Sequence, residues 1–97
     1  MTSPRICKVE HTGDRCLAVT FTDGLVRELD LTDLLTGFLD AIDDDTVFSL
    51  VTVDPISRTL SWPGGIDLDP DVLYGAQRPA GGVGPRLVRE YRLQPTS

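Results

Sequence analysis

The chain has 97 residues, of which 40% are hydrophobic and 25% are charged, and its formal net charge is −6. This composition is typical of one globular domain with a small core, and it excludes a disordered or collagen-like chain. No stretch approaches the roughly 20 apolar residues of a membrane span, and residues 1–10 hold no apolar signal core, so we expect a cytoplasmic protein.

Charge is unevenly distributed along the chain. Residues 1–76 hold fourteen acids and five bases, a balance of −9, whereas residues 77–97 hold four bases and one acid, a balance of +3. An acidic body repels a phosphate backbone, although the tail does not. We therefore expect no membrane contact and no direct contact with nucleic acid.

The first third of the chain predicts three antiparallel strands. Residues 5–11 and 15–22 alternate, carry β-branched side chains and flank a Gly-Asp turn, and residues 25–29 follow an Asp-Gly turn. Cys7 and Cys16 are then offset by several residues along the hairpin. This offset exceeds the roughly 7 Å between Cα atoms that a disulfide allows, so we expect free thiols that are buried or half-buried.

The turn before residue 25 decides which side chains of the third strand are buried. A tight two-residue turn would place Glu28 on the same face as Val19. A three-residue loop with Gly24 in a left-handed bulge instead pairs Leu17 with Leu29. Only Arg27 must then extend its charge past the core. We favour the bulged turn.

A helix is predicted over residues 31–42. Asp30 or Thr32 can cap it, and apolar side chains follow at helical spacing: Leu31, Leu34, Leu35, Phe38 and Ile42. Gly37 weakens the helix by about 1 kcal/mol relative to Ala. The acidic run 43–45 is unfavourable at a helix C-terminus, so the helix should end near Ile42.

A second pair of strands is predicted after this helix. Residues 46–53 are apolar in both alternating sets, which suits a strand covered on both faces. A turn at residues 54–57 returns the chain along residues 58–62, with Val53 opposite Arg58. A Pro-Gly-Gly sequence then ends the strand.

The remaining chain predicts a short helix and a tail. Residues 69–71, Asp-Pro-Asp, start a helix that continues through Tyr74, whereas residues 78–85 are rich in Gly and Pro and typical of a linker. We expect one domain over residues 1–76 and a linker with a basic tail over residues 77–97. The fold class is α+β: a two-layer, mainly antiparallel sheet of about five strands (β-β-β-α-β-β), with one main helix and a short C-terminal helix.

Three motifs in order carry a resemblance to a known family. They are Phe21-Thr22-Asp23-Gly24, Leu29-Asp30-Leu31 and the long stretch Trp62-Pro63-Gly64-Gly65-Ile66-Asp67-Leu68-Asp69-Pro70-Asp71-Val72-Leu73-Tyr74. In this order and spacing, the chain resembles the small bacterial proteins grouped as domain of unknown function 2442. The resemblance covers residues 5–76.

The resemblance implies a compact α+β domain with no established enzyme activity and no assigned catalytic residues. It also implies a gene often found beside that of another small protein, in arrangements suggestive of toxin–antitoxin pairs. Some relatives carry an added helix-turn-helix domain. Residues 77–97 are too short and too rich in Gly and Pro for that module.

Groups suited to catalysis or metal binding are sparse. The acids at 43–45 and the alternating acids of 67–71 could gather a divalent cation, but a solvated loop and helix capping explain them better. His11 is the only histidine, and it could act only with Cys7 or with Cys16 across the hairpin. No orienting partner or pocket is indicated, so we expect no enzyme activity, metal or cofactor.

The candidate partner-binding residues lie in the basic tail and at two earlier aromatic positions: Arg86, Arg89, Tyr91, Arg92, Trp62 and Tyr74. The tail could bring cations and an apolar anchor to a partner on one face of a helix or strand, or it could be disordered without a partner. The two earlier aromatic side chains could form a recognition surface or pack in the core.

The sequence predicts a protein-binding module, the antitoxin-like member of a two-gene pair, whose acidic body masks a basic, toxin-like protein and whose tail clamps it. One alternative is a regulatory domain that acts through a separate DNA-binding protein. Another is a metal-dependent or Cys/His enzyme. Exposed edge strands in so small a sheet would also permit a homodimer.

Overall fold

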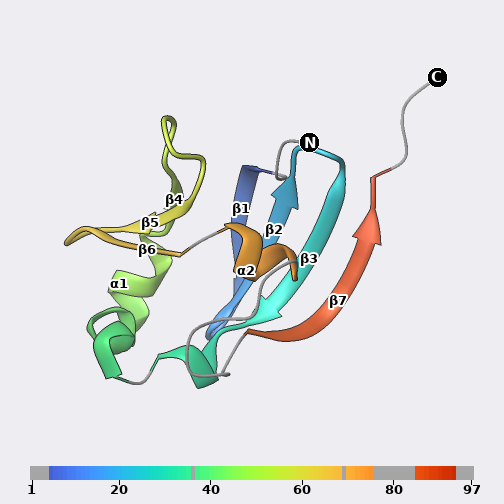
Figure 1. The fold of residues 1–97 in the computed structure, drawn as a ribbon. Coiled ribbons are helices and arrows are strands. Elements are labelled where there is room, and N and C mark those ends of the chain that lie inside the picture. Colours follow the sequence, from blue (N-terminus) through green and yellow to red (C-terminus); the bar gives the residue numbers. More distant parts are fainter. Residues whose placement is uncertain (1–4, 36, 69, 76–84, 94–97) are drawn as a thin grey trace.

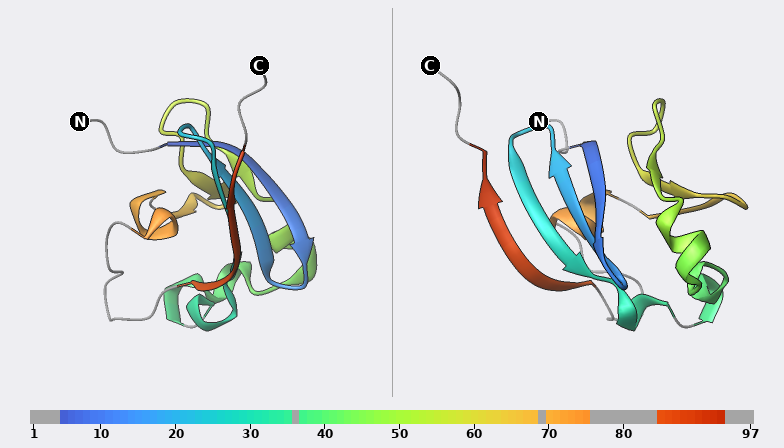
Figure 2. Two further views of the ribbon diagram at one scale, coloured as in Figure 1. Left: turned by 90° about the vertical axis from the view of Figure 1, so that its right-hand side faces the viewer. Right: turned by 180° about the vertical axis from the view of Figure 1, so that it is seen from behind.

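The computed structural model describes residues 5–35, 37–68, 70–75 and 85–93. Within these ranges the chain is α+β, with a four-stranded sheet in the order β1-β2-β3-β7 and a three-stranded sheet in the order β4-β5-β6. The larger sheet lies on one side of the core, and the smaller sheet and the short helix α1 lie on the other side (Figures 1 and 2). The helix α2 lies against the larger sheet. The expected single sheet of five strands is therefore wrong in its arrangement.

The larger sheet is antiparallel throughout and contains the three strands expected from the first third of the sequence. Its strands are β1 (Ile6–Gly13), β2 (Cys16–Phe21), β3 (Leu25–Asp30) and β7 (Arg86–Arg92). The bulged turn is confirmed, because Gly24 has a φ of 89° and Leu17 lies opposite Leu29. Only glycine adopts that backbone conformation without strain. Both cysteines are free, as expected, but only Cys16 is half-buried, whereas Cys7 is exposed.

The predicted helix over residues 31–42 is replaced by two 3₁₀ segments, η1 (Thr32–Leu34) and η2 (Gly37–Ile42). The Asp30 carboxylate accepts hydrogen bonds from both the amide and the hydroxyl of Thr32. The second segment ends at Ile42, as expected. Three of the expected apolar side chains are buried although no continuous helix forms: Leu31, Leu35 and Ile42. Packing in the core requires these side chains to be buried, but it does not require a regular backbone between them. The side chain of Phe38 lies outside the described part.

The predicted strand over residues 46–53 is wrong for most of its length. Residues Asp45–Ser49 form the helix α1, and β4 covers only Thr52–Val53. The side chain of Asp44 accepts hydrogen bonds from the amides of Thr46 and Val47, which is an N-cap. Capping and the burial of Phe48 outweigh the β propensity of the β-branched residues.

The hairpin of the smaller sheet has a longer turn than the sequence suggested. Val53 lies opposite Leu60 rather than Arg58, because the Asp54 side chain accepts hydrogen bonds from two turn amides and Arg58 adopts a φ of 59°. The strand β5 (Leu60–Trp62) does not end the sheet either. A turn through two glycines leads into β6 (Ile66–Leu68), with Trp62 opposite Ile66.

The short C-terminal helix is present as α2 (Pro70–Tyr74), although its expected cap, Asp69, lies outside the described residues. Arg27 of β3 holds this helix on the sheet, since its Nη1 donates a hydrogen bond of 3.0 Å to the carbonyl of Leu73. Among the described segments, no helix combines the length and the apolar character needed to cross a membrane.

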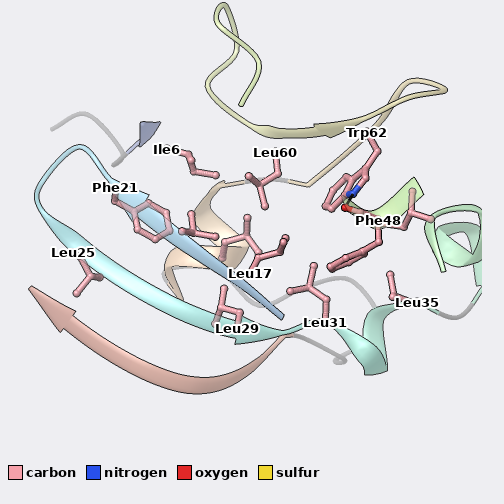
Figure 3. Close-up of a cluster of buried hydrophobic side chains, with 13 residues drawn as sticks. Ile6, Leu17, Phe21, Leu25, Leu29, Leu31, Leu35, Phe48, Leu60 and Trp62 are labelled. Atoms are coloured by element: carbon pink, nitrogen blue, oxygen red, sulfur yellow. Dashed lines mark hydrogen bonds between the residues drawn. The ribbon is translucent and has the colours of Figure 1, made fainter. Parts of the chain in front are cut away.

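The core fills the space between the two sheets. Figure 3 shows side chains of β2 and β3 pointing toward those of α1 and β5. The buried cluster comprises Ile6, Leu17, Val19, Phe21, Leu25, Leu29, Leu31, Leu35, Ile42, Phe48, Leu60, Trp62 and Leu73. Burial of these apolar side chains is the main favourable term for a domain of this size.

We predict that Gly75→Ala destabilises the protein more than Gly64→Ala. Both glycines have positive φ, 90° and 95°, so each alanine costs about 1 kcal/mol of strain. A Cβ on Gly75 would also lie 2.5 Å from Arg27 Nη1, whereas a Cβ on Gly64 meets nothing within 4 Å. We expect a further loss of about 1 kcal/mol for Gly75→Ala, measured by urea unfolding, because the Arg27 guanidinium must shift and weaken its hydrogen bond to the Leu73 carbonyl. Equal losses would contradict the close packing of Arg27 under α2.

Candidate protein-interaction surface

The strand β7 forms one edge of the larger sheet (Figure 1). All seven of its residues are exposed. It pairs with β3 from Leu25 opposite Arg92 to Asp30 opposite Arg86. Of the alternatives left open for the tail, a strand is the one observed over these residues, because β3 pairs with one side of its backbone. The expected division of the chain at residue 76 stays a prediction, since residues 76–84 lie outside the described part.

The direction of the main-chain groups of β7 follows from one hydrogen bond. The amide of Leu93 donates to the carbonyl of Gly24 over 2.8 Å, so it points toward β3. Backbone direction alternates along a strand, so Tyr91 and Arg89 also direct their main-chain groups toward β3. The N–H and C=O groups of Glu90 and Arg92 therefore point away from the sheet, toward the open edge.

Tyr91 and Arg89 share the face of the sheet that is turned away from the core. Their partners on β3 are Val26 and Glu28, and Val26 is buried but lies outside the core cluster. The Arg89 guanidinium lies 5.5 Å from the centre of the Tyr91 ring, and its Nε lies 3.6 Å from Glu28 Oε1. Tyr91 remains 46% exposed.

Glu90 and Arg92 occupy the opposite face, and each is paired with a charge from its own chain. Arg27 Nε lies 3.0 Å from Glu90 Oε1, although its N–H is not aligned for a hydrogen bond. Arg92 Nη1 lies 3.6 Å from Asp23 Oδ2 and donates a 3.1 Å hydrogen bond to the Asp23 carbonyl. Glu90 is not among the partner-binding residues expected from the sequence, although its place between arginines in an alternating segment is a visible signal.

Tyr74 links α2 to the turn between β2 and β3. Its hydroxyl donates a hydrogen bond to the Asp23 carboxylate, and its ring packs edge-on against Phe21 with 4.9 Å between centroids. This hydrogen bond, followed by that from the Leu25 amide and by the charge of Arg92, lowers the pKa of Asp23. The same bond raises the pKa of Tyr74. Tyr74 thus has a structural partner and is half-buried.

Trp62 lies in the core and not on a recognition surface. Its side chain is 2% exposed, and its Nε1 donates a 3.1 Å hydrogen bond to the carbonyl of Phe48 (Figure 3). The core alternative for this residue is therefore the one observed. The other candidate residues stay a prediction, and four of them lie together on β7.

Exposed apolar side chains are concentrated along β7. Among the described residues, six large apolar side chains are exposed, and four of them lie between residues 87 and 93: Leu87, Val88, Tyr91 and Leu93. Their exposed fractions range from 45% to 52%. An edge strand that carries both unpaired backbone groups and apolar side chains is a typical site for addition of another strand.

The acidic run 43–45 has structural partners. Arg15 Nε lies 2.9 Å from Asp43 and its Nη1 lies 2.7 Å from Asp45, while Asp44 caps α1. Within the described ranges, no three His, Cys, Asp or Glu side chains gather as metal ligands would. Asp69 and the side chain of Asp71 lie outside those ranges.

The pairing of the first hairpin separates the candidate Cys and His groups. His11 lies opposite Leu17, and Cys16 lies opposite Gly13, so the expectation that Cys16 faces His11 is wrong. The His11 ring packs instead against Phe48, with 5.3 Å between centroids. Its Nε2 lies 3.3 Å from the carbonyl of Asp14. These contacts are those of a residue at the edge of the core.

The comparison with protein families supports the resemblance carried by the three motifs. The model of a family of proteins of unknown function, DUF2442, matches residues 6–79. The chain belongs to DUF2442. No curated protein and no solved structure matches it. The DUF2442 match includes the strands β1 to β6 and α2, whereas β7 lies beyond the matched residues.

We predict that Tyr74→Phe raises the pKa of Asp23 toward its ordinary value, because it removes the largest cause of the lowered pKa. A lowered folded pKa stabilises the fold above the unfolded pKa, and this contribution is lost as pH falls through the folded value. The difference in unfolding free energy between the unmodified protein and Tyr74→Phe should therefore become smaller in acid. Titration of the carboxyl carbons by NMR tests the pKa of Asp23, and urea unfolding at neutral and acidic pH tests the stability difference.

Asp54 provides the control for that titration. Its pKa is also lowered, but by the amides of Ser57 and Ile56 in its own turn. It should titrate identically in the two proteins. An unchanged pKa of Asp23 in Tyr74→Phe would contradict the role assigned to the hydroxyl.

Proposed function

We propose that this chain is a protein-binding module that accepts a strand of its partner along the open edge of β7. The observation that carries the proposal is a strand whose seven residues are all exposed and whose only neighbour among the described strands is β3. A partner strand would satisfy the outward main-chain groups of Glu90 and Arg92. It would also cover the exposed apolar side chains that are concentrated there.

The partner that fits best is a basic, toxin-like protein encoded beside this one, which makes the chain an antitoxin-like member of a two-gene pair. The acidic balance of residues 1–76 supports this choice. Asp14 and Asp45 flank Arg15 and remain 90% and 85% exposed, so they leave negative charge available to a partner. Charge complementarity of this kind speeds association and selects the partner.

We predict that Glu90→Pro weakens binding of the adjacent gene's product by roughly tenfold or more, because it removes one interstrand hydrogen bond and leaves an acceptor of the partner unpaired. The N–H of Glu90 faces away from β3, so the proline costs no bond inside the sheet. Titration calorimetry after co-expression and separation of the two proteins gives the affinities.

Glu90→Ala is the matched control, because it removes the same carboxylate and keeps the N–H. Glu90→Ala should bind the adjacent gene's product more tightly than Glu90→Pro does. Both variants should show the same melting temperature within a few degrees. Separate elution of the two unmodified proteins at micromolar concentration would contradict the proposed pair. Equal binding by both variants would place the contact away from β7.

A further inference from the structure

We infer that β7 also pairs with β7 of a second copy of this chain, in one register that places Tyr91 on the two-fold axis. The two four-stranded sheets would then form one continuous sheet. The inference rests on the proposed function in one respect only, that the edge of β7 can accept a strand. It names the occupant of that edge when the protein is alone, so a partner would have to compete with the second copy.

Symmetry restricts the possible registers. Two copies that join edge to edge into one antiparallel sheet are related by an axis perpendicular to the sheet, so each face continues across the junction. A residue can then lie opposite only those residues of the second copy that share its face. As a result, one residue of β7 must lie opposite its own counterpart on the axis.

Charge selects among these registers. Arg89, Glu90 or Arg92 on the axis would place two like charges directly opposite each other, which destabilises a strand pair. Tyr91 on the axis places Glu90 opposite Arg92 of the second copy, and Arg92 opposite Glu90, so two favourable pairs form. The register of β7 against β3 shifts next to Val88, which limits regular pairing to the part of the strand after it.

The backbone geometry fits the same register. Glu90 and Arg92 carry the outward main-chain groups, so they would form the hydrogen-bonded pairs of the junction. Tyr91 would then occupy the non-hydrogen-bonded position, where opposite side chains approach most closely and aromatic pairs are favourable. The side chains are available, because Glu90 and Arg92 remain 44% and 58% exposed beside their internal partners.

The junction is short, so the dimer should be weak. Regular pairing extends only over residues 89–93, and each copy carries a net charge of −6. An interface below the standard size is consistent with a dissociation constant on the order of 10–100 μM. Sedimentation velocity over that concentration range should show reversible dimerisation.

Charge exchange tests the register. Glu90→Arg and Arg92→Glu should each weaken self-association at least tenfold, because each places like charges opposite each other. An equimolar mixture of the two variants should regain the dimer, as should the double variant that exchanges both charges. Arg86→Glu, which lies beyond the bulge, is the matched control and should dimerise like the unmodified chain.

A cross-linking measurement leaves the internal ion pairs intact. In a background with Cys7→Ala and Cys16→Ala, Tyr91→Cys should form a disulfide-linked dimer with diamide, since opposite Cα atoms at such a position lie about 4.5 Å apart. Arg89→Cys should not, because its counterpart lies four residues along the strand. A monomeric unmodified chain throughout the concentration range, or equal cross-linking of both variants, would overturn the inference.

These results separate the inference from the proposed function. Loss of partner binding in Glu90→Pro, together with a chain that is monomeric alone, would support the binding edge and reject the second copy as its occupant. A dimer with the expected charge dependence and no binding of the adjacent gene's product would support the second copy as the occupant of this edge. It would reject the adjacent gene's product as the partner.

Discussion

The pairing of β3 with β7 is the interaction on which the candidate surface depends. It makes β3 an internal strand of the larger sheet and moves the open edge to a segment separated from it by more than fifty residues of sequence. It also brings Glu90 to Arg27 and Arg92 to Asp23, two contacts between residues far apart in the chain. The contact between Arg92 and Asp23 connects the basic segment to the same turn that Tyr74 holds from α2.

An open edge strand is a hazard for a small protein, because its unpaired backbone can bind almost any extended segment. In this sheet the edge carries four charged side chains, Arg86, Arg89, Glu90 and Arg92, beside its apolar ones. Charges at an edge oppose indiscriminate pairing, and their order favours some partners over others. The same residues can therefore protect the edge and select what binds there.

Several polar side chains that could have formed a functional site have partners within the fold instead. Arg15 binds two acids of the run at 43–45 and the third caps a helix, so that run helps to join α1 to the first hairpin. Trp62 similarly uses its one polar atom on the carbonyl of Phe48. Polar groups with such partners hold the fold together. Among the described residues, β7 is where the outward main-chain groups of an edge strand and exposed apolar side chains coincide.

Local chemistry in the sequence determined the first three strands and the short C-terminal helix. Gly24 specifies the bulged turn that pairs Leu17 with Leu29, and Asp-Pro-Asp marks the start of α2, because both signals act within a few residues. The apolar positions of residues 31–42 likewise identified core side chains, although not the backbone between them.

Only the tertiary structure decided α1, the separation into two sheets and the place of β7. Residues 45–49 are helical because the Asp44 cap and the burial of Phe48 outweigh strand propensity. For β7, the deciding bonds come from β3, more than fifty residues away, and no local pattern contains that partner. The sequence by itself thus specified the local turns and the core side chains, whereas long-range pairing decided which edge remained open.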